Sequence, residues 1–244
     1  MEFDVKHNLF CSEYLQMKCG DVEFNNQNKK LYRGELSNFV KETTDKGFKF
    51  LSLRFDASNV DLLTAAVSCD FIFTECLITF SMNLDVVEDD PNSHSDDDLA
   101  SLSDIDVISQ ISRGSFEHDR FHIDPLIDNC CADELKAAWS ENCVRGRSDK
   151  VFVVRDKNKK VIGFNACKIG FDSASIDLIA VEKKSQKTGV ASRLVQMCVQ
   201  EYGRKKNRLF VGTQANNTAS INFYVKHGFL INSVQYTFHR HSHF

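Results

Sequence analysis

Three apolar runs separated by two short polar turns, between residues 151 and 181, constrain the fold of this chain more than any other feature. The runs are VFVVR, VIGFNAC and ASIDLIAV, and the turns lie at residues 156–160 and 170–173. Apolar runs of this length, joined by turns this short, pair as neighbouring antiparallel strands. The segment therefore predicts a three-stranded antiparallel meander.

Helices are predicted on both sides of the meander. The run ADELKAAWSENC precedes it, and a helix with one apolar face follows the polar loop EKKSQKTG. The apolar residues of that second helix are Ala191, Leu194, Val195, Cys198, Val199 and Tyr202. A strand (RLFVGT), a helix that Asn217 caps and Gly228 ends, and a last strand (FLINSVQYTFH) complete the order βββαβαβ.

The first third of the chain predicts an α/β unit of its own. Helix, strand, helix and strand alternate in GELSNFVKETTDKG, FKFLSLRF, NVDLLTAAVSC and FIFTECLITF. The strongly acidic segment that follows favours a linker or an exposed loop. We therefore predict a smaller N-terminal α/β domain over residues 1–84, an acidic linker or loop over 85–115, and a second domain over 116–244.

The composition favours an ordinary globular protein. With 42% hydrophobic residues the 244-residue chain can bury a core, and its net charge of −4 argues against nucleic acid as the main partner. The most apolar stretch, FIFTECLITF, is about half the ~20 residues of a membrane span and contains Glu75, so we expect no membrane partner. Nine cysteines without a CxxC spacing predict reduced thiols and no metal site. The N-terminal residues lack the apolar region of a signal peptide, which predicts a cytoplasmic location.

The loop at residues 186–191 has the properties of a phosphate-binding site. It joins a strand to a helix, where free backbone N–H groups and the positive end of the helix dipole point outward. Gly189 lets an anion approach the backbone closely, and nearby lysines and Arg193 add positive charge. A diphosphate would fit, although such a glycine could equally serve tight packing of a helix on a strand. The predicted anion-binding residues are Gln186, Lys187, Thr188, Gly189, Val190 and Ala191.

Two motifs resemble those of the GNAT acetyltransferases. The first is the loop QKTGVA after the strand IDLIAV, and the second is NNTASINFYVKHGF, in which Asn217, Tyr224 and Gly228 fall at the family's spacing. The resemblance covers residues 132–238. It implies a GNAT fold, which is a mixed, mostly antiparallel, splayed sheet flanked by helices. It also implies acyl-CoA, as acetyl-CoA or a similar thioester, as co-substrate.

The same resemblance implies where acyl-CoA lies. The pantetheine arm would enter the gap between ASIDLIAV and RLFVGT, bonding the backbone near Ile179 and Val181, with Asn217 on the other side. Tyr224 would stand beside the thioester sulfur. Because a phenol stays protonated at neutral pH, we expect Tyr224 to be the catalytic acid. The alternative is a half-buried aromatic residue with a structural role only.

The sequence does not identify the base that takes the proton of the attacking amine. Asp177 lies on the strand beside the acyl pocket, but its side chain could equally point to solvent. Cys167 and Cys198 fall in apolar patterns that predict core residues, so direct transfer without an acyl-enzyme is favoured. Three alternating histidines near the C-terminus resemble a metal cluster in spacing, but we interpret them as one exposed face of a strand end. They are His239, His241 and His243.

The whole chain is more specifically similar to the TDP-fucosamine N-acetyltransferase branch of this superfamily, whose members act on nucleotide-linked amino sugars. The similarity rests on LRFDASNVDLLTAAVSCDFIFTECLITF, DRFHIDP and AAWSENCV, with Asp119 in place of the branch's serine. Arg120 could bind a diphosphate, because a guanidinium binds it bidentately, and Phe121 or Trp139 could stack on a base or a sugar. The alternatives are structural roles: an ion pair of Arg120 with Asp124, and packing of Trp139 in the core. The predicted acceptor-binding residues are Arg120, Phe121, Asp124 and Trp139.

These features predict an acyl-CoA-dependent N-acyltransferase. It would transfer an acetyl or short hydroxyacyl group to the amine of a TDP-linked amino-6-deoxyhexose by direct attack, for cell-surface polysaccharide biosynthesis. Two alternatives stay open: a GNAT enzyme that acts on a protein amine or a small polyamine, and a non-catalytic acyl-CoA-binding module. A homodimer is left open as well.

Overall fold

The computed structural model describes residues 3–24, 33–84, 98–203 and 205–242. The N-terminal part contains β1 (Phe3–His7), α1 (Leu9–Leu15), β2 (Cys19–Phe24), α2 (Arg33–Asp45), β3 (Phe50–Asp56), α3 (Val60–Ser68) and β4 (Ile72–Asn83). The middle part contains η2 (Leu102–Asp104), α4 (Ile105–Arg113), α5 (Arg120–Ile123), α6 (Asn129–Asn142) and η3 (Cys143–Arg147). The C-terminal part contains β5 (Lys150–Arg155), β6 (Val161–Ile169), β7 (Ser173–Val181), η4 (Lys183–Ser185), α7 (Val190–Tyr202), β8 (Arg208–Gln214), α8 (Thr218–Lys226) and β9 (Leu230–His241).

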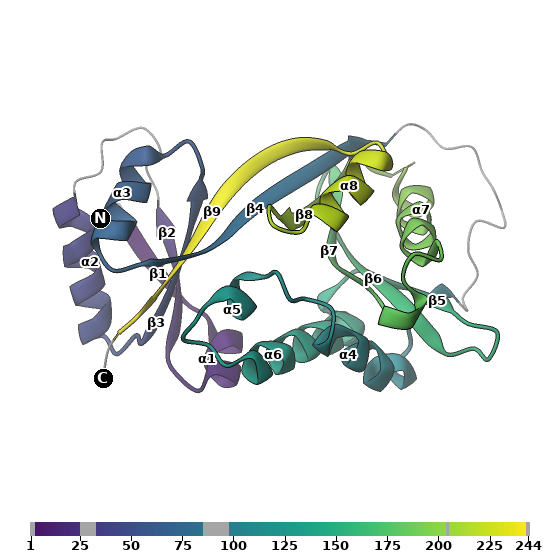
Figure 1. Cartoon of the computed structure of the whole chain (residues 1–244), viewed down its shortest axis with the longest axis horizontal. Helices are drawn as coiled ribbons and strands as arrows, with labels where there is room; N and C mark the ends of the chain where they lie inside the picture. The colour runs from purple at the N-terminus through teal and green to yellow at the C-terminus, as the bar shows by residue number, and fades with distance from the viewer. Residues whose placement is uncertain (1–2, 25–32, 85–97, 204, 243–244) are drawn as a thin grey trace.

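The strands of the described residues form one nine-stranded sheet, in the order β1-β2-β3-β9-β4-β8-β7-β6-β5. The pairs β2–β3 and β7–β8 are parallel, and the other neighbours are antiparallel. The long strands β4 and β9 run side by side and connect the N-terminal and C-terminal parts of the sheet (Figure 1). Because β9 lies between β3 and β4, a single sheet extends through both predicted domains, whose boundaries stay a prediction.

The C-terminal half confirms the predicted fold class and order. Strands β5, β6 and β7 pair as an antiparallel meander, and α7, β8, α8 and β9 follow. Helix α7 buries Leu194, Val195 and Cys198, as its periodicity predicts. The sulfur atoms of Cys167 and Cys198 lie 3.4 Å apart in this core.

Helices cover both faces of the sheet. In β5, Phe152 and Val154 contact the cluster that contains α7 and α8, whereas Val151 and Val153 contact the cluster of α4 and α6. This alternation follows from the two-residue period of a strand. Helices α2 and α3 cover the N-terminal strands with a separate apolar cluster.

Two segments differ from the sequence prediction. Residues 3–24 form β1, α1 and β2, for which no elements were predicted. Part of the predicted linker forms α4, which buries Ile105, Ile108 and Ile111 at helical spacing; residues 85–97 of that linker lie outside the described residues. In the described part of the chain, no helix has both the length and the apolar character needed to cross a membrane.

Candidate active site

The sheet opens between β7 and β8. Their parallel pairing runs from Ser173 opposite Arg208 to Ile176 opposite Val211, although both strands continue beyond these residues. At the same point β7 carries one residue more than β6, because Ala166 pairs with Leu178 and Cys167 with Ile176. Such a bulge bends a strand locally. The splayed strand pair that the family resemblance implied is therefore present.

A cavity of about 440 Å³ occupies this opening. Its walls come from β3, β4, α5, α6, β7, β8 and α8, together with residues 115–119. Ile179, Asn217 and Tyr224 line it near the opening, and Arg120 and Trp139 line it on the side of α5 and α6. We call it the acceptor cavity. Elements from both halves of the chain thus enclose one space.

Tyr224 lies on α8 at the wall of the acceptor cavity. Its side chain packs against Phe80 and Phe229, with ring centroids 5.8 Å and 5.6 Å away, and the residue is 4% exposed. Burial raises the pKa of the Tyr224 phenol above its usual value of 10.0. The hydroxyl therefore stays protonated at neutral pH, and the same burial makes it a weaker acid than an exposed phenol. Asn217 begins the same helix, because its side chain accepts a hydrogen bond of 3.1 Å from the N–H of Ser220.

The predicted phosphate loop ends in the first turn of α7, which begins at Val190. Gly189 has φ +92°, a left-handed conformation that favours glycine. The side chains of Gln186 and Thr188 donate to the carbonyl oxygens of Val181 (3.3 Å) and Ser185 (2.7 Å), which stabilises the turn. Val190 is buried, whereas Lys187 and Thr188 are exposed. The loop therefore presents its backbone at the N-terminus of a 13-residue helix, a favourable position for an anion.

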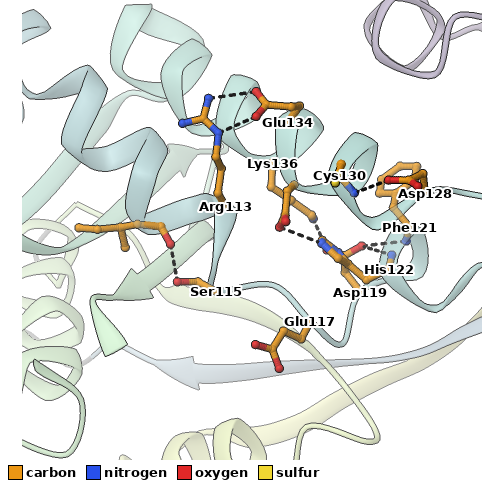
Figure 2. Close-up of polar contacts among 12 residues, drawn as sticks. Arg113, Ser115, Glu117, Asp119, Phe121, His122, Asp128, Cys130, Glu134 and Lys136 are labelled. Atoms are coloured by element: carbon orange, nitrogen blue, oxygen red, sulfur yellow. Dashed lines mark hydrogen bonds and ion pairs between the residues drawn. The ribbon is translucent and has the colours of Figure 1, made fainter. Parts of the chain in front are cut away.

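Asp119 organises the segment between α4 and α6. Its carboxylate accepts hydrogen bonds from the N–H of Phe121 (2.8 Å) and from His122 Nδ1 (3.0 Å), and it pairs with Lys136 Nζ at 3.3 Å (Figure 2). Burial by itself would raise the pKa of Asp119, but the charge of Lys136 and the bond to His122 lower it to about 2. Asp119 thus begins α5 and holds Arg120 at the cavity wall.

The four predicted acceptor residues have different environments. Arg120 lines the acceptor cavity, and its Nη1 donates to Ser52 Oγ at 3.2 Å. Phe121 also borders the cavity but is 1% exposed and packs in an apolar cluster with α1 and α6. Asp124 is buried and is not part of the cavity lining, so we no longer propose it as an acceptor ligand. It does not pair with Arg120 either.

Trp139 and Asp177 lie in contact. Trp139 Nε1 donates to Asp177 Oδ2 at 3.2 Å, and the guanidinium of Arg147 lies 4.4 Å from the Trp139 ring centroid. Arg147 and Lys168 form ion pairs with the same carboxylate oxygen, at 3.0 Å and 3.4 Å. Asp177 is therefore directed toward α6 and η3. Two cations thus pair with its carboxylate.

The prediction of an exposed histidine face is wrong. His239 is fully buried, and both His239 Nδ1 and His241 Nε2 lie 2.8 Å from Asp124 Oδ2. The physical reason is that Phe50 of the neighbouring strand β3 and Phe121 of α5 cover this face of β9, with ring centroids 4.6 Å and 5.7 Å from that of His239. Burial, which outweighs the hydrogen bond to Asp124, lowers the pKa of His239 to about 4. His243 lies outside the described residues.

Sequence reasoning missed an ion-pair network in the acceptor cavity. Glu75 on β4 is 5% exposed and accepts from Arg54 Nη2 (2.8 Å), Gln214 Nε2 (2.7 Å) and Thr237 Oγ1 (3.2 Å). Lys136 lines the same cavity. The available signal was the charge of Arg54 and Glu75 within apolar strand runs, since a buried charge requires a partner or a ligand.

A splayed sheet, a glycine loop before a helix and a buried tyrosine at the opening are the features that the family resemblance implied for an acyl-CoA-dependent N-acyltransferase. Residues 114–229 match the acetyltransferase (GNAT) family, so the chain carries a GNAT domain. A functionally unknown conserved protein from Staphylococcus epidermidis has the same fold, with a TM-score of 0.64, 12% identity, and coverage of 98% of this chain and 91% of that one. A GCN5-related N-acetyltransferase from Sphaerobacter thermophilus has a TM-score of 0.59 at 10% identity, covering 98% and 76%.

Two relatives are similar in sequence. The spore coat polysaccharide biosynthesis protein SpsD of Bacillus subtilis is 28% identical over 137 residues, which cover 56% of this chain and 47% of SpsD. The dTDP-fucosamine acetyltransferase of Escherichia coli is 27% identical over 187 residues, which cover 75% of this chain and 78% of that protein. The chain thus matches about half the length of the first relative and most of the second.

Proposed function

We propose that this protein transfers an acetyl or short hydroxyacyl group from CoA to the amine of a TDP-linked amino-6-deoxyhexose. The acceptor cavity carries the proposal, because it extends from the strand opening beside Tyr224 to Arg120. A thioester at one end and an anionic acceptor at the other would place amine and carbonyl in one enclosed space. The names of the E. coli and B. subtilis relatives support an amino sugar and a role in surface polysaccharide biosynthesis. We place the activity in the cytoplasm.

Acyl-CoA would bind along the opened edge of β7. Beyond Ile176 this edge is no longer paired with β8, so the pantetheine amides could bond the backbone at Ile179 and Val181 as an added strand would. The side-chain amide of Asn217 would contact the arm from α8. The backbone of residues 186–191 would hold the pyrophosphate at the positive end of α7.

Transfer would proceed by direct attack. The neutral amine adds to the thioester carbonyl, a C–N bond forms and the C–S bond breaks. The proton that the nitrogen loses passes through water to the Tyr224 phenolate, which restores the phenol after it has protonated the thiolate. The departing thiolate takes a proton from the Tyr224 hydroxyl, which burial keeps protonated. Cys143 and Cys167 are buried, and the more exposed Cys76, Cys130 and Cys131 do not line the acceptor cavity, so we expect no acyl-enzyme.

The charges of the cavity wall favour an anionic acceptor over a polyamine. Arg54 is paired with Glu75, and Lys136 is paired with Asp119. Within the described residues no carboxylate forms an ion pair with Arg120, whose recorded hydrogen-bond partner is the neutral hydroxyl of Ser52. A half-buried guanidinium in this state is suited to bind phosphate oxygens.

The test measures the free thiol of CoA that is released when the protein is incubated with acetyl-CoA and each of a panel of amines. We expect turnover with TDP-linked amino-6-deoxyhexoses and little with a peptide N-terminus or spermidine. Preference for the peptide or for spermidine would contradict the proposal. Binding of acetyl-CoA without turnover of any amine would instead support a non-catalytic module.

A further inference from the structure

A second cavity lies directly behind Arg120. It has a volume of about 260 Å³, and Phe10, Asp21 and Asn142 contribute to its walls. Arg120 and Trp139 line both this cavity and the acceptor cavity. We call it the α1 cavity, because Phe10 and its neighbours on α1 form one side. An extended ligand that passes Arg120 would occupy both cavities.

Arg120 is positioned to bind an anion between the two cavities. Asp119 caps the short helix that begins with Arg120, and Ser52 Oγ accepts from Arg120 Nη1. The guanidinium carbon lies 4.7 Å from the centroid of the Phe121 ring, which supports one face of the group. The guanidinium is therefore held in place by an aromatic face and a neutral hydroxyl.

The α1 cavity has the lining that a planar, polar ring requires. Phe10 is half-buried and stands edge-on to Trp139, with ring centroids 6.1 Å apart. The carboxylate of Asp21 accepts a hydrogen bond of 2.8 Å from Asn8 Nδ2, and Asn142 supplies an amide at the end of α6. A nucleobase combines a flat face for stacking with N–H and C=O groups at its edge, which match Phe10, Asp21 and Asn142.

We propose that the α1 cavity binds the nucleoside of the acceptor, with Arg120 bound to the diphosphate and the amino sugar in the acceptor cavity. This assignment rests on the proposed function, since it requires a nucleotide-linked acceptor. The nucleoside, the diphosphate and the amino sugar would then occupy neighbouring positions in the same order as in the acceptor molecule.

A larger cavity of about 830 Å³ shares Arg54 with the acceptor cavity. Glu23, Asp56 and Asp61 are among its lining residues. Three carboxylates would repel a diphosphate, and the Arg54 guanidinium is already paired with Glu75. This cavity is the alternative that the experiments must exclude.

The first experiment measures binding of TDP alone to the full chain by calorimetry. Phe10→Ala should weaken TDP binding about tenfold, since stacking of one base contributes that much or more. Leu9→Ala is the matched control, because Leu9 lies on the same helix, is 71% exposed and is not part of the cavity lining. Arg120→Met should weaken TDP about tenfold to a hundredfold through loss of charged hydrogen bonds, with Arg120→Lys between it and the wild type.

Three outcomes would overturn the assignment. One is equal TDP affinity of the wild type, Phe10→Ala and Asn142→Ala. Another is competition between TDP and CoA, which would place TDP at the CoA loop. The third is loss of TDP binding in Gln235→Ala, a change in the cavity beside Arg54. Asn142→Ala serves as the second variant if Phe10→Ala lowers the melting temperature strongly.

The second experiment separates this inference from the proposed function. In thiol-release kinetics, Phe10→Ala should raise the KM for a TDP-amino sugar about tenfold and leave kcat unchanged. For an amino-sugar 1-phosphate, which lacks the nucleoside, KM should not change. Turnover of the TDP-amino sugar with the same KM in wild type and Phe10→Ala would refute the nucleoside site alone. TDP binding that depends on Phe10, without turnover of any TDP-amino sugar, would refute the proposed function alone.

Discussion

The proposed CoA site and the proposed acceptor site are built in opposite ways. On the CoA side, residues 186–191 are contiguous, mostly exposed, and offer backbone groups at the start of α7. On the acceptor side, Arg54, Glu75, Arg120 and Lys136 come from four different elements and act through their side chains. A site made of backbone groups requires a particular local conformation, so a short sequence motif marks it. A site made of side chains from distant segments has no such motif in the sequence.

The two sites also differ in electrostatics. The CoA loop has an exposed ion pair beside it, Lys183 with Glu117, whose side chains are 71% and 68% exposed. On the acceptor side, Asp119 and Lys136 have side chains only 5% and 9% exposed. Exposed pairs contribute little to stability, whereas loss of one partner of a buried pair is costly. Substitutions at the acceptor site should therefore affect folding more than those at the CoA site.

The largest effect is expected for Tyr224→Phe, at the point where the two sites meet. Loss of the hydroxyl removes proton donation to the thiolate, so turnover at saturating acceptor should fall at least about tenfold. If Tyr224 supplies all of the general-acid catalysis, the fall should be ~10² to 10⁴-fold. Affinities for CoA and acceptor should hold, because the effect is confined to the transition state. Near-normal turnover with a lowered melting temperature would show that Tyr224 is structural.

Asp119→Asn tests the buried electrostatics of the acceptor site. The substitution leaves the Lys136 ammonium buried without its carboxylate, so the free energy of unfolding should fall by about 3 kcal/mol. Glu134→Gln is the control in the same region, because the Glu134 and Arg113 side chains are 56% and 46% exposed (Figure 2). It should change stability by no more than about 0.5 kcal/mol in urea unfolding. Equal losses of unfolding free energy in Asp119→Asn and Glu134→Gln would contradict the expected difference between buried and exposed ion pairs.

His239 should make stability depend on pH. Because the pKa of His239 is lowered from 6.5 to about 4, the unfolded chain binds more protons than the folded chain between these values. The free energy of unfolding should therefore fall as pH falls from about 6.5 to about 4, by up to about 3 kcal/mol from this group. His239→Gln should flatten that part of the profile, and His118→Gln, at an exposed position, should not. A slope that persists in His239→Gln would assign it to other groups.

The smallest of these effects is expected for Gly189→Val at the CoA site. A β-branched residue at φ +92° is strained, and its side chain would stand where an anion approaches the backbone. CoA affinity should fall about tenfold in calorimetric titration, while the affinity for TDP stays unchanged. Lys187→Ala should have a smaller effect, because it removes only an exposed charge. Unchanged CoA affinity in Gly189→Val would refute the loop assignment.

Local periodicity predicted much of the C-terminal half. The meander, the apolar face of α7 and the capped helix with Tyr224 follow from spacings within about a dozen residues, and each was found. The left-handed conformation of Gly189 was not predicted, although the glycine itself was singled out in the loop. The features that were predicted depend on the conformation of consecutive residues, which a single sequence records directly.

The acceptor site could not be predicted in the same way. Glu75 was noted only as a charge within an apolar run, and its bonds to Arg54, Gln214 and Thr237 join residues far apart in the chain. The burial of His239 depends on the position of β9 between β3 and β4, which no local pattern indicates. The cover of this face of β9 by Phe121 of α5 likewise joins segments far apart in the chain.

The sequence by itself thus determined the order of the C-terminal elements, the glycine loop and the position of Tyr224, because hydrogen bonding and apolar spacing act over a few neighbouring residues. The tertiary structure alone decided the strand order, the burial of Asp119, Asp124 and His239, and the meeting of Arg120 with two cavities. These depend on which distant segments pack together, and that choice is made by the total burial of apolar surface and the pairing of buried charges.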